Sequence, residues 1–152
     1  MKIMVPTQTP AKVTLNEAKE HVSKAIDVEM YRYERYGVPF CLVALSTENP
    51  THFDYIKHYL RKTDILIPLS DHCACIALAS TEIDEAVKMG SNFIRDHATL
   101  DQQNRIYFGV TSVKHEHLNY DIVSRAFYSL EKAREQNIST VEDDNILESM
   151  KV

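Results

Sequence analysis

The stretch at residues 64–79 reads DILIPLSDHCACIALA and decides the fold prediction. Two apolar runs, 64–69 and 73–79, flank the polar triplet Ser70-Asp71-His72. Apolar runs of this length are typical of β-strands, and a short polar break between two of them is typical of a hairpin. The stretch therefore predicts two antiparallel strands that are joined at residues 70–72.

A helix and a buried strand are expected on the N-terminal side of this hairpin. Thr14 and Glu17 form a capping-box pattern, after which apolar residues recur at helical spacing. Gly37 and Pro39 then provide the residues with which helices commonly end. The continuous apolar run at 40–45 predicts a strand that is covered on both faces.

The remaining elements complete a recognisable order. A short helix is expected after Pro50 and a longer one after Thr81, then a strand at 105–113 and a helix at 120–136. Two βαβ crossovers around one hairpin predict an α/β fold, a ferredoxin-like βαββαβ sandwich with an added N-terminal and C-terminal helix. We expect a leader at 1–13, one domain at 14–137, and a short strand or acidic tail at 138–152.

Composition narrows the classes of protein that fit the chain. It has 152 residues, 44% hydrophobic and 26% charged, an ordinary globular balance. A net charge of −5 argues against a broad phosphate-binding surface, so we expect no nucleic-acid partner. No run of 18 apolar residues exists, so we expect no membrane insertion and a cytoplasmic protein. Three glycines and three cysteines leave no glycine-rich phosphate loop and no disulfide framework.

Four segments in this order resemble those of GGDEF domains, the bacterial signalling fold that makes cyclic di-GMP from two GTP. YERYGVPF at 33–40 is similar to the family's RRYGRPLALL, and LRKTDI at 60–65 is similar to its LRxTDxxxR. IYFGVT at 106–111 resembles TVSIGVA, and residues 126–133 resemble ADxALYxAK with a register shift of about one residue. The likeness covers roughly residues 18–137 and implies a sandwich of the GGDEF and nucleotide-cyclase type.

The catalytic residues of that family are missing. At the hairpin, the Gly-Gly-Asp/Glu-Glu-Phe signature is replaced by Ser70, Asp71, His72, Cys73 and Ala74. The family's other metal-binding aspartate corresponds to Ser46. Mg²⁺ requires charged oxygen ligands, which this set does not supply. In the family, the two glycines let the nucleotide approach the backbone closely, and this chain lacks them. We therefore expect a degenerate domain that is not an enzyme and holds neither a metal nor a cofactor.

Chain length supports the same expectation. Only 17 residues separate Ser46 from Asp64, which is room for one helix. The family has two helices and the substrate-binding FKxxND segment there, of which HFDYIK at 52–57 retains little. Phosphoryl transfer depends on positioning and charge neutralisation, so we expect no cyclase activity.

One ligand site of the family is retained in sequence. Arg61 and Asp64 match its inhibitory RxxD motif, and five residues separate Asp64 from Ser70, as in the family. The resemblance implies that this pair binds cyclic di-GMP, since a guanidinium pairs with phosphate or a guanine edge. The alternative is structural, because an arginine at a helix end and an aspartate before a strand are common. A further arginine is usual in the family, and here Asn92 occupies its position, with Arg95 nearby.

The cysteines and histidines allow two other kinds of site, each with a packing role as the alternative. His72, Cys73 and Cys75 with His115 and His117 suggest zinc, but their spacing is not that of a zinc site. Cys73, Cys75, Ala77 and Ala79 would share one face of a strand, which small buried residues under a helix explain. Cys41 lies in an apolar strand, where cysteine is usually inert.

The aromatic residues near the end of the first helix allow two interpretations. Tyr31, Tyr33 and Tyr36 with Arg32 and Arg35 could stack on nucleic-acid bases. A packing and interface face is the simpler interpretation in an acidic chain.

The sequence leaves three functional hypotheses. The first is a catalytically inactive GGDEF-like regulatory module that binds cyclic di-GMP through Arg61 and Asp64 or binds a protein partner. The second is a ligand-independent interaction scaffold or assembly subunit, including a homodimer. The third is an unrelated ferredoxin-like domain, which predicts that the hairpin at Ser70 does not lie beside Ser46.

Overall fold

A computed structural model describes residues 14–50, 53–98, 104–113 and 121–143. The leader at 1–13 and residues 144–152 lie outside the described residues. In the described part, no helix is both long and apolar enough to cross a membrane.

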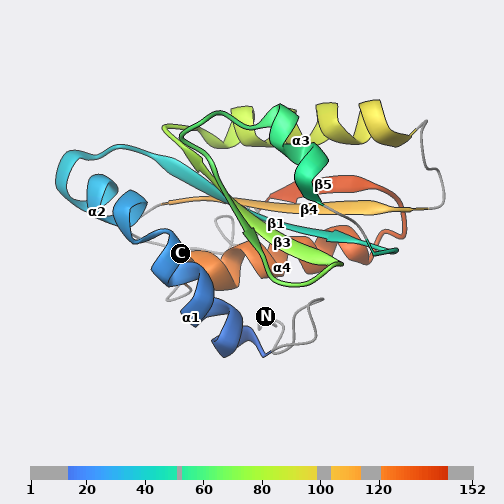
Figure 1. Cartoon of the computed structure of the whole chain (residues 1–152), viewed down its shortest axis with the longest axis horizontal. Coiled ribbons are helices and arrows are strands. Elements are labelled where there is room, and N and C mark those ends of the chain that lie inside the picture. Colours follow the sequence, from blue (N-terminus) through green and yellow to red (C-terminus); the bar gives the residue numbers. More distant parts are fainter. Residues whose placement is uncertain (1–13, 51–52, 99–103, 114–120, 144–152) are drawn as a thin grey trace, which may run out of the picture.

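One five-stranded sheet with the order β2-β3-β1-β4-β5 forms the middle layer (Figure 1). The strands are β1 (Phe40–Thr47), β2 (Ile65–Pro68), β3 (Cys73–Ala79), β4 (Ile106–Ser112) and β5 (Thr140–Asp143). β1 to β4 pair antiparallel in the order that a βαββαβ sandwich requires, which confirms the predicted α/β fold. β5 pairs parallel to β4, so the chain from residue 140 to 143 is a strand rather than a solvated tail.

Helices cover both faces of this sheet. They are α1 (Leu15–Ala25), α2 (Asp27–Tyr36), η1 (Phe53–Tyr59), α3 (Ile83–Ala98) and α4 (Ile122–Arg134). Figure 1 shows α3 on one face and α1 with α4 on the other, with α2 at one end of the sheet.

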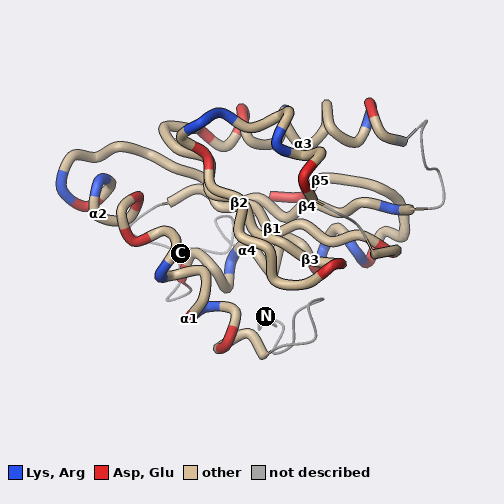
Figure 2. Tube along the Cα trace, in the orientation of Figure 1, with Lys and Arg blue, Asp and Glu red and all other residues tan. Residues whose placement is uncertain are grey.

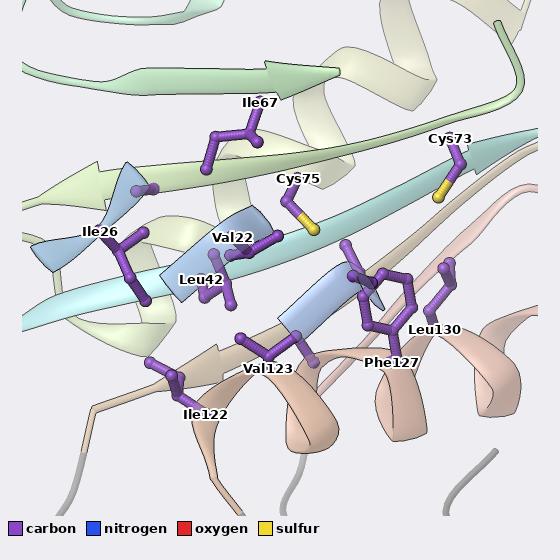
Figure 3. Packing of buried hydrophobic residues seen from close by; sticks show 14 of the residues in the cluster. Val22, Ile26, Leu42, Ile67, Cys73, Cys75, Ile122, Val123, Phe127 and Leu130 are labelled. Carbon is purple, nitrogen blue, oxygen red and sulfur yellow. The ribbon is translucent and has the colours of Figure 1, made fainter. Parts of the chain in front are cut away.

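The two faces carry separate hydrophobic clusters. Against α1 and α4, side chains such as Val22, Leu42 and Phe127 are buried together with Cys73 and Cys75 (Figure 3). The opposite cluster joins η1 and α3 to the other face of β1, β3 and β4. β1 is buried over its whole length because it contributes side chains to both clusters.

The prediction of a single N-terminal helix is wrong in one respect. Thr14 caps the helix as predicted, with its Oγ1 accepting from the Glu17 N–H at 3.1 Å. The helix then breaks at Ile26, whose φ of −102° and ψ of 12° separate α1 from α2. Gly37 ends α2 in the left-handed region at a φ of 69°, as its place in the sequence indicated.

Candidate functional site

The hairpin between β2 and β3 lies directly beside the end of β1. Ser46 pairs with Cys73 on one side and with Tyr107 on the other. The backbone N–H of Thr47 donates to the His72 carbonyl oxygen at 2.9 Å. The hypothesis of an unrelated ferredoxin-like domain predicted that hairpin and strand end would be apart, and that prediction is wrong.

The hairpin residues that replace the family signature are engaged with one another. Ser70 Oγ accepts from the His72 N–H at 3.1 Å, and the Ser70 N–H donates to the Cys73 carbonyl at 3.0 Å. His72 Nδ1 lies 3.3 Å from the Thr47 carbonyl oxygen, and His72 Nε2 lies 3.7 Å from Asp71 Oδ1. The carboxylate of Asp71 is therefore exposed and lies beside the imidazole of the next residue.

Of the positions that correspond to the family's metal ligands, Ser46 and Cys73 carry uncharged, buried side chains, whereas His72 is partly exposed. Ser46 is 2% exposed, and its Oγ has no hydrogen-bond partner among the described residues. Cys73 and Ala74 are fully buried on the adjacent strand. Across residues 14–50, 53–98, 104–113 and 121–143, no three His, Cys, Asp or Glu side chains are grouped so that they could hold a metal ion. Among the described residues, Ser46 and Cys73 thus provide none of the charged oxygen ligands that Mg²⁺ prefers.

The cysteines are core residues. Cys73, Cys75 and Ala77 belong to the same cluster, as the strand alternation predicted. Burial raises the pKa of the Cys75 thiol well above its usual value, and the neighbouring Cys73 raises it further. Cys41 is also fully buried, with its Sγ 3.3 Å from the Thr81 carbonyl oxygen. Thiols in such surroundings are poor nucleophiles and poor metal ligands. His115 and His117 lie outside the described residues.

One polar pair at this end of the sheet was not found from the sequence. Tyr107 donates its hydroxyl proton to Glu48 Oε1 at 2.8 Å. Burial, and then the hydrogen bond to Glu48, raise the pKa of Tyr107 above its usual value. The two residues are 59 positions apart, so only the pairing of β1 with β4 brings them together.

The described part of the segment between β1 and β2 contains one short helix, as predicted, and this helix, η1, is of the 3₁₀ type. η1 is fixed to α3 by aromatic contacts, with the rings of Tyr55 and Phe93 stacked at 5.5 Å. Tyr59 donates to Asp96 Oδ2 at 2.9 Å, and burial followed by this bond raises the pKa of Tyr59. Phe53 and Ile56 of this helix lie in the hydrophobic core. The segment is therefore packed onto α3.

The carboxylate of Asp64 lies at the centre of the RxxD pair and is 2% exposed. It accepts from the backbone N–H of Arg61 at 2.8 Å and from that of Ala79 at 3.1 Å. The Arg61 side chain donates two further hydrogen bonds to this carboxylate, from Nη2 to Oδ1 at 3.2 Å and from Nε to Oδ2 at 3.4 Å. Asp64 thus closes the turn after η1 and ties it to the end of β3.

The Arg61 side chain is 54% exposed, and one edge of its guanidinium points into the protein. Its Nη2 also donates to the Ala79 carbonyl oxygen and to Thr81 Oγ1, the latter at 2.6 Å. Thr81 Oγ1 in turn donates to the Ala79 carbonyl at 2.8 Å. Nη1 makes no hydrogen bond within the described chain, so one edge of the guanidinium faces outward. Arg95 pairs instead with Asp96, at 3.3 Å.

Comparisons with known proteins show which fold the chain has. No family profile and no curated protein matches the sequence. Solved structures do match in fold. The GGDEF domain of DgcB from Caulobacter crescentus, solved with c-di-GMP, is 9% identical with a TM-score of 0.64, and the match covers 91% of this chain and 96% of that one.

Two other structures extend the comparison. The active GGEEF domain of a diguanylate cyclase from Vibrio cholerae is 16% identical with a TM-score of 0.61 over 76% of this chain and 89% of that one. SiaD from Pseudomonas aeruginosa, a diguanylate cyclase in complex with its activator SiaC, is 15% identical with a TM-score of 0.65, over 82% of this chain and 57% of SiaD. The chain therefore has the fold of GGDEF domains.

Proposed function

We propose that this chain is a catalytically inactive regulatory module of the GGDEF fold, which acts by binding. One observation carries the proposal. The end of β1, beside the hairpin, holds a buried Ser46 between Cys73 and Tyr107. Catalysis of phosphoryl transfer needs metal ions and charge neutralisation at that place. An uncharged, packed surface supplies neither.

The packing of η1 supports the same conclusion. Tyr55 and Tyr59 fix this short helix against α3 through Phe93 and Asp96. A nucleotide-binding loop must leave polar groups available to base and phosphate, whereas these groups are engaged with one another.

Incubation with GTP and Mg²⁺, followed by chromatography and mass spectrometry, tests the loss of catalysis. The active GGEEF domain of the Vibrio cholerae cyclase serves as the positive control. We expect no cyclic dinucleotide from this chain under conditions in which the control converts its substrate. Sustained turnover by this chain would refute the proposal.

Cyclic di-GMP is the first candidate ligand, and Arg61 is its candidate contact. The outward edge of the guanidinium suits a phosphate or the acceptor edge of guanine. Asp64 is a positioning residue in this arrangement, because its oxygens already accept from two backbone N–H groups and hold Arg61 in place.

Isothermal titration with cyclic di-GMP tests this ligand. Micromolar or tighter binding, about −8 kcal/mol or better, is expected for the unmodified chain and is expected to be lost in Arg61→Ala. Arg134→Ala is a matched control, since Arg134 also forms an i,i+3 pair with a carboxylate, Glu131, at 3.2 Å. Each variant is first compared in urea unfolding, because Arg61 also holds Ala79 and Thr81.

A ligand-independent scaffold is the second candidate, favoured by the saturated carboxylate of Asp64. A buried carboxylate with four protein donors has little capacity left for guanine N–H groups. A protein partner is consistent with the complex that SiaD forms with SiaC. Titration without heat and without a thermal shift would reject cyclic di-GMP and favour this second function.

A further inference from the structure

The helical segment before β1 is broken at a residue where its own sequence favours no break. Apolar residues keep their helical spacing across the break, and residues 15–36 contain neither glycine nor proline. Ile26 nevertheless leaves helical geometry, and no side chain caps the start of α2. Contacts with the rest of the protein therefore impose the bend between α1 and α2, since the local sequence favours one helix.

The bend leaves backbone donors of the segment unused. The Ile26 N–H donates to the Val22 carbonyl oxygen at 3.0 Å, and the Met30 N–H donates to the Ile26 carbonyl oxygen at 3.0 Å, as in a continuous helix. Between them, the N–H groups of residues 27–29 make no backbone hydrogen bond to the preceding turn within the described chain. One continuous helix over residues 15–36 would satisfy all three of these groups.

Only a small apolar face holds α1 to the protein. Ala18, Val22 and Ile26 are at most 2% exposed, and they belong to the cluster that contains Val123 and Phe127 of α4 (Figure 3). Alanine and valine are small side chains, so their burial stabilises the contact less than that of larger residues would. The docking of α1 therefore gains little, and it leaves the three donors at the bend unused.

One ion pair joins α1 to α4 at the surface. Lys19 Nζ lies 2.8 Å from Asp121 Oδ2, and the two side chains are 35% and 44% exposed. The side of α1 that faces solvent is polar, and Figure 2 shows charged positions along it, which include Glu17, Glu20 and Lys24. An amphipathic helix of this kind keeps its solvated face whether or not its apolar face is docked.

We propose that α1 is a detachable arm, which interconverts between the docked, bent form and a released form in which residues 15–36 make one continuous helix. Release gives up the small apolar face and regains the backbone hydrogen bonds at the bend. α2 stays in place, because Met30 and Tyr33 pack against the same cluster. The released helix is about 33 Å long and uncovers Val123 and Phe127.

This device goes beyond the proposed function and does not depend on cyclic di-GMP binding. A ligand that binds one of the two forms more tightly than the other shifts the equilibrium between them. The position of α1 thus controls access to the face of α4 that it covers.

Amide hydrogen exchange tests whether α1 opens by itself. The amides of residues 18–26 are expected to exchange about tenfold faster or more than those of β4, while the chain stays folded. Lys19→Glu places a carboxylate opposite Asp121 and is expected to accelerate exchange in α1 about fivefold, with β4 unchanged. Lys24→Glu is the matched control on the same helix, since Lys24 pairs only with Glu20, at 3.7 Å.

Distances between spin labels distinguish a released helix from a frayed one. Asn16→Cys and Glu135→Cys provide labelling sites at exposed positions on α1 and just after α4, whereas the three native cysteines are buried. In the Lys19→Glu background we expect a second, longer and narrow distance distribution beside that of the docked form. Fraying of α1 would give a broad distribution instead.

Val28→Pro tests the continuity of the released helix. The Val28 N–H makes no hydrogen bond to the preceding turn in the docked form, and the side chain is 55% exposed, so the first turn of α2 accepts proline. In a continuous helix the same ring clashes with the Lys24 carbonyl oxygen. Added to Lys19→Glu, Val28→Pro is expected to abolish the longer distance, whereas Val28→Ala is expected to retain it.

Two results would overturn the proposal. Exchange in α1 that is as slow as in β4 and unaffected by Lys19→Glu would show that α1 opens only when the whole chain unfolds. A broad distribution, or a longer distance that persists with Val28→Pro, would show that α1 does not join α2 in one helix. Far-UV circular dichroism establishes that each variant is folded, and the exchange and distance measurements decide the proposal even if the proline variant is not.

Discussion

Gly109 in β4 lies directly against the backbone of Leu130 in α4. A Cβ atom on Gly109 would come within 2.6 Å of the Leu130 Cα, and the carbonyl oxygen of Ala126 lies equally close. Backbone atoms of a packed helix cannot move aside as a flexible side chain can. The close contact of α4 with the centre of the sheet therefore depends on the absence of a side chain at this position.

Gly109→Ala is expected to lower the free energy of unfolding by about 3 kcal/mol or more, at the upper end of what overpacking costs. Urea unfolding measures the change. Gly90→Ala is the control, because its Cβ would meet a side-chain atom, Val141 Cγ2, at 2.9 Å, and alanine favours the helix by about 1 kcal/mol. Equal stabilities of the two variants would contradict the close approach at Gly109.

Ser46→Ala is expected to leave the stability unchanged or to raise it by about 1 kcal/mol, because the buried Oγ has no partner to lose. Ser46→Asp, which introduces the family's carboxylate, is expected to destabilise the chain by about 3 kcal/mol or more, since it buries an uncompensated charge. Urea unfolding with and without Mg²⁺ measures both. A stable aspartate variant that gains stability from Mg²⁺ would indicate an open metal site.

Asp64→Ala is expected to cost more stability than Arg61→Ala. The first leaves the buried N–H of Ala79 without its acceptor, at about 1–3 kcal/mol per unpaired group, in addition to breaking the pair. Arg134→Ala removes an exposed pair and is expected to cost less than about 1 kcal/mol. If chemical unfolding gives the same small loss for all three, Asp64 does not organise the turn.

Acidification is expected to weaken the contact between α1 and α4 through Asp121. Burial acts to raise the pKa of Asp121, but the ion pair with Lys19 at 2.8 Å and the Ser124 N–H at 2.8 Å outweigh it and lower the pKa. A lowered folded-state pKa gives stability that is present above the unfolded value, about pH 4, and is lost as pH falls through the lower folded value.

Asp121→Asn isolates this effect, because asparagine is an equally good N-cap but carries no charge. The stability difference between the unmodified chain and this variant is expected at neutral pH and is expected to vanish in strong acid. Urea unfolding at a series of pH values measures it. A difference that is the same at every pH would exclude Asp121 as the source.

Local signals were enough to predict most elements of the fold. The Thr14 cap, the Gly37 stop and the hairpin at residues 70–72 each depend on residues within a few positions of one another. The break at Ile26 has no such signal, since neither glycine nor proline lies near it and the apolar spacing continues. The pairing of β5 has no local signal either, because a four-residue segment with two acidic residues becomes a strand only through its neighbour β4.

The candidate site was only partly accessible from sequence for the same reason. Arg61 and Asp64 are three residues apart, so a motif could identify them. Their contacts with Ala79 and Thr81 span 15 to 20 residues and depend on where β3 ends. The bond between Tyr107 and Glu48 depends on the register of two strands, which composition and spacing do not specify.

The central place of β1 has a consequence for synthesis on the ribosome. Its neighbours on the two sides are β3 and β4, and β4 begins only at Ile106. At about 5–20 residues per second, several seconds pass between translation of β1 and translation of the strand that completes its pairing. During that interval FCLVAL, an uncharged apolar segment at residues 40–45, has one unpaired edge. An exposed apolar strand edge of this kind is prone to aggregation until β4 is available to pair with it.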